Sequence, residues 1–475
     1  MLIRNAEIRD SPGRDLRIEG ARIAAVGTLA PHPGETVIDA KGGLLLPGLH
    51  DHHIHLAGLA ARQASVSCGP PAVRDADELA RALQVPGSGW LRAIDFHESV
   101  LGGALPDAAM LDSLVPQRPL RLQHRTGRMW LLNTPALDAL LAMAPPPPGL
   151  EREGGRFTGR LFDEDAWLRT TLGSVPPDFA QVAARLAGLG VTGLTDMSPG
   201  NDAPIARHFA QQRAAGRLPQ SIVLAGSPDL AGADPKGWQL GPVKLHLHES
   251  ALPDFDEALA LVRAARTQER CVAVHCVTEV ELVFTVALLE AAGAMPGDRI
   301  EHASIASADM VVRMRALGLA VCVQPHFIAQ RGDRYLAEVE PRHHGDLYRL
   351  RSLRDAGVVL CGGSDAPYGE PDPWKSMAAA VSRRAPNGIV IGADEALSPE
   401  DALALYLADP LDLARQRRIV PGAPADLCLL DRPWREARAR LLGNDVRLVI
   451  AGGALVHQRV DEPPFERPLR ADTAA

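Results

Sequence analysis

The sequence lacks several features that would assign it to a specialised class of protein. It has six cysteines, at positions 68, 271, 276, 322, 361 and 428, and no Cys-x-x-Cys spacing. Four of them lie in short apolar runs that look like buried strands, so we expect reduced core thiols rather than disulfides or a zinc knuckle. Aromatic residues make up only 4% of the chain, and this scarcity says nothing about a substrate.

No apolar run is long enough for a transmembrane helix, and the first residues lack the basic start and apolar core of a secretory signal. We therefore expect a cytoplasmic protein that does not act at a membrane. The net charge is −8, with acidic and basic residues interspersed, which disfavours a nucleic-acid partner. The expected partner is a small molecule, and a homodimer is expected only because dimers are the commonest oligomers.

No internal repeat with a period of about 20 to 50 residues is visible, which argues against solenoids and propellers. Short apolar runs instead alternate with helical patterns at 255–266, 279–292 and 308–317. Eight such runs are expected to be strands: 43–50, 191–196, 221–225, 243–247, 272–276, 299–302, 319–323 and 358–361. The alternation predicts an α/β protein built on a (β/α)₈ TIM barrel.

Two parts of the chain do not fit a barrel that spans residues 43–419. Residues 1–42 and 420–475 both read as short strands joined by turns, so we expect one small β-sandwich built from the two termini. Residues 57–187 are too long for a loop and contain their own strand patterns. We interpret them as a subdomain inserted after the first barrel strand.

The segment His-Asp-His-His-Ile-His at residues 50–55 contains two overlapping His-x-His pairs. Residues two apart on a strand point the same way, so such a pair at a strand's C-terminal end can aim both imidazoles into the mouth of a barrel. The alternative is histidines satisfied by hydrogen bonds in the core. We favour His53 and His55 as ligands because they lie nearer the C-terminal end, and we expect His50 and His52 to point outward under the helices.

Residues that can bind metals also end four of the later predicted strands: Lys244, His275, His302 and Asp365. Buried polar groups need partners, and one cation can satisfy several of them together. Imidazole and carboxylate ligands suit a divalent metal, with Zn²⁺ foremost and Fe²⁺, Mn²⁺ or Co²⁺ as alternatives. We expect a catalytic site in which metal-activated hydroxide attacks the substrate and Asp365 carries the proton.

These motifs together resemble the metal-dependent amidohydrolase superfamily. The resemblance rests on residues 47–55, Lys244, His275, 299–302 and 363–367. The resemblance is greatest to the branch of N-substituted formamide deformylases, amidohydrolase family 3. The recurring sequence motifs of that branch are similar to residues 191–196, 323–325, 352–357, 398–402 and 421–427.

The resemblance implies that His53, His55 and Asp365 bind one metal, and that His275 and His302 bind a second. It further implies that Lys244 bridges the two as a carbamate formed with CO₂. A free lysine, with a pKa near 10.4, is protonated and a poor ligand, whereas its CO₂ adduct is an anion with two oxygens. The alternative is a one-metal site in which Lys244 pairs with Asp365.

The sequence departs from the pattern of this branch after Lys244. His248 and Glu249 stand where relatives have Asp-Gly-Ser, and His246 and His248 share the lysine's face if the strand continues. We expect these two histidines to line the substrate pocket or to offer further ligands.

Three more residues are candidates for substrate binding. Arg128 stands where relatives have a histidine before Asn133, and either meets a polar or anionic substrate group or is a surface arginine. Gln324 and His326 follow the seventh predicted strand. Both are placed to touch substrate, although His326 could equally cap a helix.

The pattern favours a hydrolase of a non-peptide C–N bond in an amide, N-acyl amine or cyclic amide. Deaminases of the superfamily use a glutamate three residues after the histidine of strand five, whereas here position 278 is threonine and the glutamate is at 279. Lactonase, esterase and phosphotriesterase activities need the same metals and remain alternatives. A non-enzymatic scaffold is disfavoured because the ligand set is intact.

Overall fold

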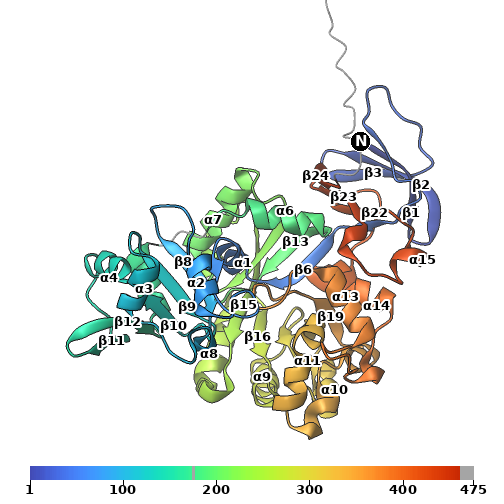
Figure 1. The fold of residues 1–475 in the computed structure, drawn as a ribbon. Helices are drawn as coiled ribbons and strands as arrows, with labels where there is room; N and C mark the ends of the chain where they lie inside the picture. Colours follow the sequence, from blue (N-terminus) through green and yellow to red (C-terminus); the bar gives the residue numbers. More distant parts are fainter. Residues whose placement is uncertain (174–176, 460–475) are drawn as a thin grey trace, which may run out of the picture. The chain divides into compact units, whose positions relative to one another are not determined.

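The computed structural model describes residues 1–173 and 177–459 (Figure 1). The chain divides into two compact units, of which the first is Met1–Leu56 together with Asp178–Ala475 and the second is Ala57–Pro177. The inserted unit ends ten residues before the predicted boundary at 187, because helix α6 (Ala180–Gly188) buries Val182 and Leu186 and packs on a strand of the first unit.

An eight-stranded parallel sheet forms the centre of the first unit. Its strands are β6 (Leu49–Ile54), β13 (Val191–Asp196), β14 (Ser221–Gly226), β15 (Gln239–His246), β16 (Val272–Cys276), β17 (Arg299–His302), β18 (Ala320–Val323) and β19 (Val359–Gly362). They are hydrogen-bonded in sequence order from β6 to β19, which confirms the prediction of a (β/α)₈ barrel.

The two outer strands of this sheet meet through the loop that follows β19. Asp365 N donates to the carbonyl of His53 at 2.6 Å, and His55 N donates to the carbonyl of Ala366 at 2.8 Å. Ile54 and Ala366 form a parallel bridge at the same place. The barrel therefore closes at the C-terminal end of β6, beside the His-x-His pair.

Asp51 strengthens this closure from inside the sheet. Its Oδ1 accepts hydrogen bonds from the backbone N–H groups of His53 at 3.1 Å and Ser364 at 2.9 Å. Burial raises the pKa of Asp51 to about 6 despite these bonds. One carboxylate thus links β6 to the loop after β19.

The predicted first strand, residues 43–50, is divided between two sheets. Residues Leu45–Pro47 form β5, which pairs with β22 (Leu427–Leu430), and the barrel strand β6 begins only at Leu49. The change occurs at Gly48, where a Cβ atom would lie 2.2 Å from Thr192 Oγ1. Only glycine lets the backbone approach Thr192 this closely. The sequence did not show the change, because an apolar run does not reveal where a chain leaves one sheet for another.

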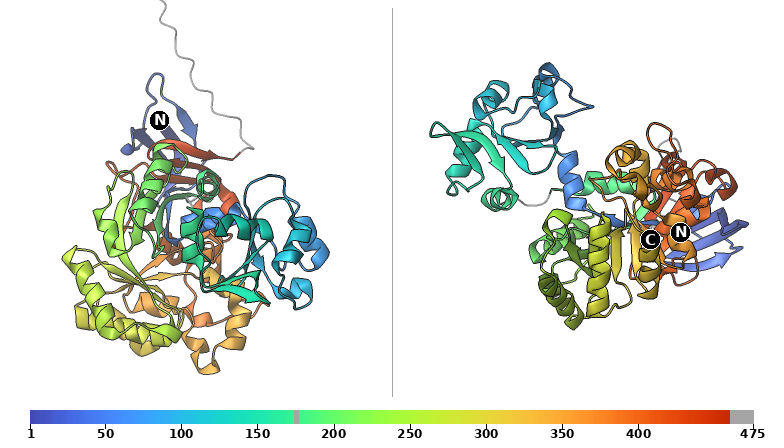
Figure 2. Two further views of the ribbon diagram at one scale, coloured as in Figure 1. Left: turned by 90° about the vertical axis from the view of Figure 1, so that its left-hand side faces the viewer. Right: turned by 90° about the horizontal axis from the view of Figure 1, so that it is seen from below.

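Helices lie outside the barrel sheet in each view (Figures 1 and 2). Besides α6 they are α7 (Ala203–Ala214), α8 (Phe255–Thr267), α9 (Glu279–Ala292), α10 (Ala308–Ala316), α11 (His326–Glu338), α12 (Leu350–Asp355), α13 (Pro373–Ser382) and α14 (Pro399–Leu407). Side chains cap the first turns of several of them; Asp254 accepts from two N–H groups of α8, and Thr278 and Glu281 form a capping box on α9.

Residues from the two ends of the first unit form two four-stranded sheets, called here the terminal sheets. One has the order β3 (Arg22–Gly27), β2 (Ser11–Glu19), β1 (Leu2–Ile8), β4 (Val37–Asp39), and the other has the order β24 (Ala454–Gln458), β23 (Val446–Ala451), β22, β5. Ile3, Leu16, Leu429 and Ile450 belong to one apolar core that both sheets share. A short hairpin, β20 (Ala408–Asp409) and β21 (Asp412–Gln416), and helix α15 (Trp434–Ala437) complete this unit.

The inserted unit contains one mixed sheet and its own core. The sheet order is β11 (Leu150–Glu153), β12 (Arg156–Phe162), β10 (Met129–Leu132), β9 (Leu120–His124), β8 (Leu91–Phe96), β7 (Val66–Ser67). Its helices are α2 (Ala76–Ala82), α3 (Ala108–Leu114), α4 (Thr134–Leu141) and α5 (Asp165–Leu172), and α1 (Leu56–Gln63) leads into it. Strands β8 and β9 show that this part of the sequence forms strands of its own.

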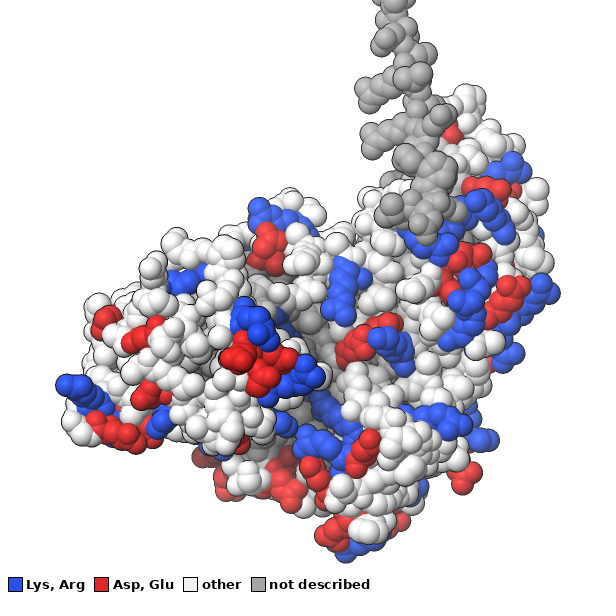
Figure 3. Space-filling model, viewed as in Figure 1, with Lys and Arg blue, Asp and Glu red and all other residues white. Residues whose placement is uncertain are grey.

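The surface and the thiols have few special features. Acidic and basic side chains are interspersed on the face shown in Figure 3, and all six cysteines are free. Among the described residues, no helix combines the length and apolarity that crossing a membrane requires.

Replacing Leu429 by alanine should destabilise the terminal sheets. Leu429 is fully buried in their shared core, and truncation leaves a cavity, so we expect the free energy of unfolding to fall by about 2–5 kcal/mol. The midpoint of denaturant unfolding measures this change. Leu411→Ala is the control, because Leu411 is 60% exposed and its truncation should change stability by less than about 0.5 kcal/mol. Equal losses in the two variants would contradict the packing described here.

Candidate metal centre

Side chains from several barrel strands line one cavity of about 350 Å³. Strand ends supply its histidines and its lysine, and the loop after β19 supplies Asp365 and Tyr368. The lining residues are His53, His55, Lys244, His246, His248, His275, Val277, His302, Ser304, Phe327, Arg331, Tyr335, Tyr348, Asp365 and Tyr368. Every predicted metal-ligand residue is among them.

Three of these side chains bring their donor atoms together. Asp365 Oδ1 lies 3.1 Å from His55 Nε2 and 3.4 Å from His53 Nε2. Ligand atoms about 2.1 Å from one tetrahedral zinc ion are roughly 3.4 Å apart. The spacing of the donors therefore fits a single shared cation.

The backbone around Asp365 is shaped to present this carboxylate. Asp365 has φ 53°, a left-handed conformation that non-glycine residues rarely adopt. Two residues earlier, a Cβ atom on Gly363 would lie 2.5 Å from the backbone N of His53. The loop can approach β6 this closely only because position 363 is glycine.

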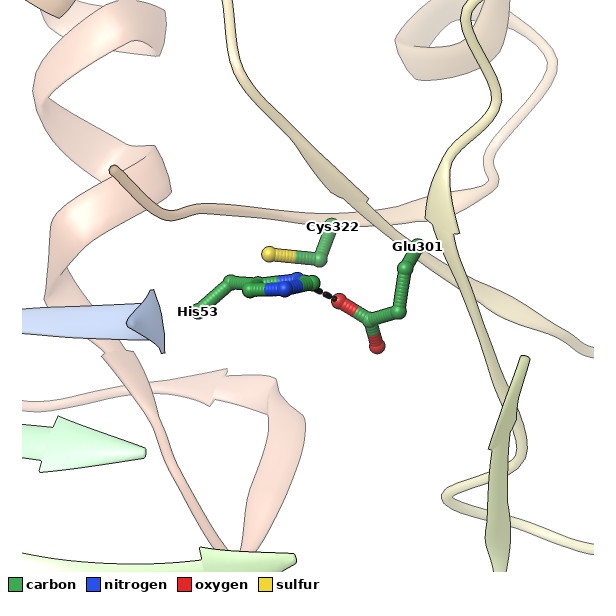
Figure 4. Close-up of side chains that lie close together, drawn as sticks. All are labelled: His53, Glu301 and Cys322. Atoms are coloured by element: carbon green, nitrogen blue, oxygen red, sulfur yellow. Dashed lines mark hydrogen bonds and ion pairs between the residues drawn. The ribbon is translucent and has the colours of Figure 1, made fainter. Parts of the chain in front are cut away.

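A buried hydrogen bond between His53 and Glu301 fixes the orientation of His53 (Figure 4). His53 Nδ1 lies 2.5 Å from Glu301 Oε2, and the Arg299 guanidinium holds both oxygens of Glu301, at 2.5 Å and 2.9 Å. Burial opposes ionisation of Glu301, but Arg299, His53 and Lys244 together outweigh it and keep the pKa of this carboxyl well below its ordinary value. A charged Glu301 makes Nδ1 of His53 the donor and leaves Nε2 free to bind a cation.

Cys322 lies beside this pair, and its sulfur, His53 and Glu301 have ligand atoms within 4.8 Å of one another (Figure 4). The three are poor candidates for a separate metal site. Both oxygens of Glu301 are already bonded to Arg299, and burial raises the pKa of the Cys322 thiol well above its ordinary value. This group supports the site rather than offering ligands.

Lys244, His275 and His302 form the adjoining part of the cavity. The rings of His275 and His302 lie edge to face with centroids 4.6 Å apart, and the centroid of His302 lies 5.0 Å from that of His53. Burial lowers the pKa of Lys244, and among the described residues its Nζ finds no hydrogen-bond partner. An orphaned buried nitrogen is costly unless it gains a ligand or a covalent modification.

His302 reaches the cavity through an unusual backbone. Glu301 already faces the barrel interior, so regular alternation would turn His302 away from it. His302 instead has φ 73°, and the following Ala303 has φ 45°. Gln324 Oε1 lies 2.7 Å from His302 Nδ1 and orients the ring with Nε2 free.

Burial keeps these imidazoles neutral. It lowers the pKa of His53 to about 3 and that of His246 to about 4, and it holds the pKa of His275 and His302 below the ordinary value. Neutral imidazole is the form that binds metals. These nitrogens fit one or two divalent cations together with two further groups. One is the Asp365 carboxylate, and the other is Lys244, whose Nζ has no hydrogen-bond partner among the described residues.

The other predicted site residues have varied places. His246 and His248 line the cavity, with the His246 ring stacked on His275 at 4.4 Å. Gln324 and His326 are buried behind the lining; His326 contacts Ser376 Oγ and the carbonyl of Ser364.

Arg128 lies in the inserted unit, where its guanidinium forms a bidentate pair with Asp163 and is largely exposed. A contact between Arg128 and a substrate stays a prediction.

The second His-x-His pair lies away from the cavity lining. His50 Nε2 contacts Thr195 Oγ1 at 2.9 Å, and the rings of His50 and His52 lie 4.5 Å apart. Both are buried.

Several residues that shape the site have roles that the sequence does not reveal. Asp51, Arg299 and Glu301 occur in recognisable motifs, but their roles depend on contacts across the barrel. The spacing of Arg299 and Glu301, two apart on a buried strand, is the available signal that both face inward. Phe327, Arg331 and the tyrosines of the cavity wall give no such signal.

Comparison with known proteins identifies the family. The sequence profile described as "Amidohydrolase family" matches residues 36–457, most of the 475-residue chain. The chain belongs to the amidohydrolase family. This amidohydrolase is accordingly an enzyme that hydrolyses carbon–nitrogen bonds.

Relatives and solved structures agree with that membership. N-substituted formamide deformylase of Arthrobacter pascens is 27% identical, over 96% of this chain and 97% of the relative. The putative amidohydrolase YtcJ of Bacillus subtilis is 24% identical, over 90% of this chain and 91% of the relative.

In fold, the amidohydrolase is similar to an uncharacterized metal-dependent hydrolase of Pyrococcus horikoshii OT3. The TM-score is 0.76 at 20% identity, and the match covers 96% of this chain and 99% of the other. A second such hydrolase, from Pyrococcus furiosus, has a TM-score of 0.73 at 23% identity, covering 91% and 98% of the two chains.

Glu301→Gln should weaken metal binding without removing any proposed ligand. The amide cannot hold the His53 ring as a carboxylate does, and loss of such a partner typically lowers metal affinity about 10- to 100-fold. Competition with a chromophoric chelator measures the affinity. Glu395→Gln is a matched control, because Glu395 is also buried and accepts a backbone hydrogen bond, from Ser352. Unchanged affinity in a folded Glu301→Gln protein would contradict the orienting role.

Proposed function

We propose that this amidohydrolase cleaves the C–N bond of a small non-peptide amide, N-acyl amine or cyclic amide. The centre would hold one or two divalent cations, with zinc foremost and iron, manganese or cobalt as alternatives. The observation that carries the proposal is the convergence of His53 Nε2, His55 Nε2 and Asp365 Oδ1. We also retain a cytoplasmic location and a homodimer as proposals.

The first cation would be held by His53, His55 and Asp365, and a second by His275 and His302. A bound divalent cation supplies Lewis-acid polarisation of a carbonyl oxygen and ionises water near neutral pH. The chain's contribution is to fix the ligands before substrate arrives. Glu301 does this for His53, and Gln324 does it for His302.

Lys244 would bridge the two cations as a carbamate. Burial favours the neutral amine, which is the form that reacts with CO₂, and the nitrogen has no competing partner among the described residues. The one-metal alternative needs a hydrogen bond or ion pair between Lys244 and Asp365. Among the described residues, the Asp365 carboxylate instead lies within 4 Å of the ring nitrogens of His53 and His55.

Asp365 is placed to transfer a proton from the attacking water to the departing nitrogen. Burial opposes its ionisation, but the hydrogen bond from His55 and the nearby histidines outweigh burial and keep its pKa below the ordinary value. The carboxylate is therefore charged at neutral pH and can accept a proton from the attacking water. It can then donate that proton to the departing nitrogen, as C–N cleavage requires.

His246 and His248 would bind the substrate directly from the wall of the cavity. Gln324 and His326 would act one step further away, by positioning His302 and the loop at Ser364. These proposed roles differ from the sequence-based expectation that Gln324 and His326 touch the substrate, which stays a prediction.

Two observations favour amide hydrolysis over deamination. Glu279 is absent from the described cavity lining, and its carboxylate lies 3.8 Å from His343 Nε2. The relative from Arthrobacter pascens is named for deformylation of N-substituted formamides, which supports an amide as the scissile group. Lactones and phosphotriesters remain the alternative substrates to compare.

The double variant His53→Ala/His55→Ala should lose bound metal and hydrolysis together. Loss of several kcal/mol of transition-state stabilisation predicts a fall in turnover of roughly 10³-fold or more. Metal content by mass spectrometry and initial rates on matched amides, lactones and phosphotriesters measure both effects. His50→Ala/His52→Ala is the control from the same segment and should keep its metal. Faster wild-type turnover of lactones or phosphotriesters than of amides would refute the amide assignment.

Lys244→Ala should lower the metal content from two ions to at most one per chain. The carbamate can be detected independently, because growth of the wild type with ¹³C-labelled bicarbonate should give a carbamate carbon signal by NMR. That signal should be absent from Lys244→Ala. A wild-type protein that binds two ions without the signal would exclude the carbamate, and a variant that keeps two ions would exclude any bridging role for Lys244.

A further inference from the structure

One face of helix α11 forms a wall of the cavity. Phe327, Arg331 and Tyr335 recur at intervals of four residues, which places them on the same side of the helix. All three line the cavity that contains the candidate ligands. No step of the proposed hydrolysis uses these three side chains.

Arg331 is held in place by an aromatic ring and a backbone carbonyl. Its guanidinium carbon lies 4.1 Å from the centroid of the Phe327 ring, and its Nη2 donates to the carbonyl of Tyr368. Among the described residues, no carboxylate forms an ion pair with it. Arg334, on the same helix, is by contrast paired with Glu338 at 3.0 Å.

Hydroxyl groups continue the polar surface beside Arg331. Tyr335 Oη lies 3.2 Å from Tyr348 Oη, and Ser304 Oγ lies 3.1 Å from the same Tyr348 oxygen. All three side chains line the cavity. A guanidinium next to hydroxyl donors is an arrangement that recognises carboxylates.

The contacts of Tyr368 connect this wall to the candidate ligands. The carbonyl of Tyr368 receives the bond from Arg331, and its ring lies edge-on to His55 with centroids 5.6 Å apart. Tyr368 therefore contacts both the guanidinium and the ring of one candidate ligand. A substrate with its scissile amide at His55 would reach Arg331 by extending along the same cavity.

We infer that Arg331, assisted by the hydroxyl of Tyr335, binds a carboxylate of the substrate and determines its specificity. This inference rests on the proposed function and names the class of substrate: a small amide whose amine part carries a carboxylate, as in an N-acyl amino acid. The cavity of about 350 Å³ lies at the lower end of the range for small-molecule sites, about 300–1,000 Å³, which suits a compact compound of this kind.

A second role for Arg331 must be separated from this one. By bonding to the Tyr368 carbonyl, the guanidinium could simply brace the loop that carries Asp365. Loss of a brace would slow the turnover of every substrate equally. Loss of a carboxylate contact would act only on anionic substrates.

The test uses two compounds of equal size, N-formyl-alanine and N-formyl-alaninamide, which differ in one negative charge. Binding to the metal-loaded protein is measured by calorimetry, and hydrolysis is measured as formate release. We expect the wild type to prefer the anionic compound, and Arg331→Gln to reduce that preference by roughly 10- to 100-fold, as expected for charge-assisted hydrogen bonds. Arg331→Lys should restore part of the preference, and the matched control Arg334→Gln should leave it unchanged.

The outcomes separate the inference from the proposed function. No preference in the wild type, or a preference that survives in Arg331→Gln, would overturn the inference. An equal loss for both compounds would do the same and would assign Arg331 to bracing. An Arg331-dependent binding preference without hydrolysis of any amide would uphold the inference while refuting the proposed reaction.

Discussion

The site depends on how the barrel closes. Backbone hydrogen bonds join the end of β6 to the loop after β19, and they involve the same residues whose side chains would bind the cation, His53, His55 and Asp365. The carboxylate of Asp51 ties the two segments together again. Closing the sheet and assembling the ligands are therefore one event, and a misregistered closure would separate the imidazoles from the carboxylate.

The charged groups around this junction of β6 with the loop after β19 give each side chain a defined protonation state. Arg299 helps to keep Glu301 ionised, and Glu301 sets the tautomer of His53. Burial keeps the imidazoles of His53, His275 and His302 neutral. Removing one member of such a buried network is costly because its partner is left without compensation. The arrangement maintains a rigid, partly strained site, as the left-handed backbone of His302 and Asp365 indicates.

Sequence patterns predicted much of this architecture. The barrel strands are short apolar runs, and the carboxyl ends of parallel strands meet at one rim, so the pattern alone predicts that Lys244, His275 and His302 lie together. The pattern could not show that the chain leaves one sheet for another at Gly48, because both sheets accept apolar residues. The ligands themselves remain proposals that the geometry supports.

The supporting residues were harder to predict. The role of Glu301 depends on a contact with His53, 248 positions away, and no local spacing encodes it. The cavity wall on α11 was missed for a similar reason, because helical periodicity gives the residues that share a face but not what that face meets. Arg331 is recognisable only from the structure, in which no described carboxylate pairs with it.

The switch between sheets at Pro47 and Gly48 has a consequence for biosynthesis. The His-x-His segment leaves the ribosome early, but β5, just before it, pairs with β22, which is made almost four hundred residues later. The pairing of β5 with β22 can therefore form only when nearly the whole chain has been made. During synthesis the histidine segment is therefore present long before the barrel that would fix the directions of its side chains.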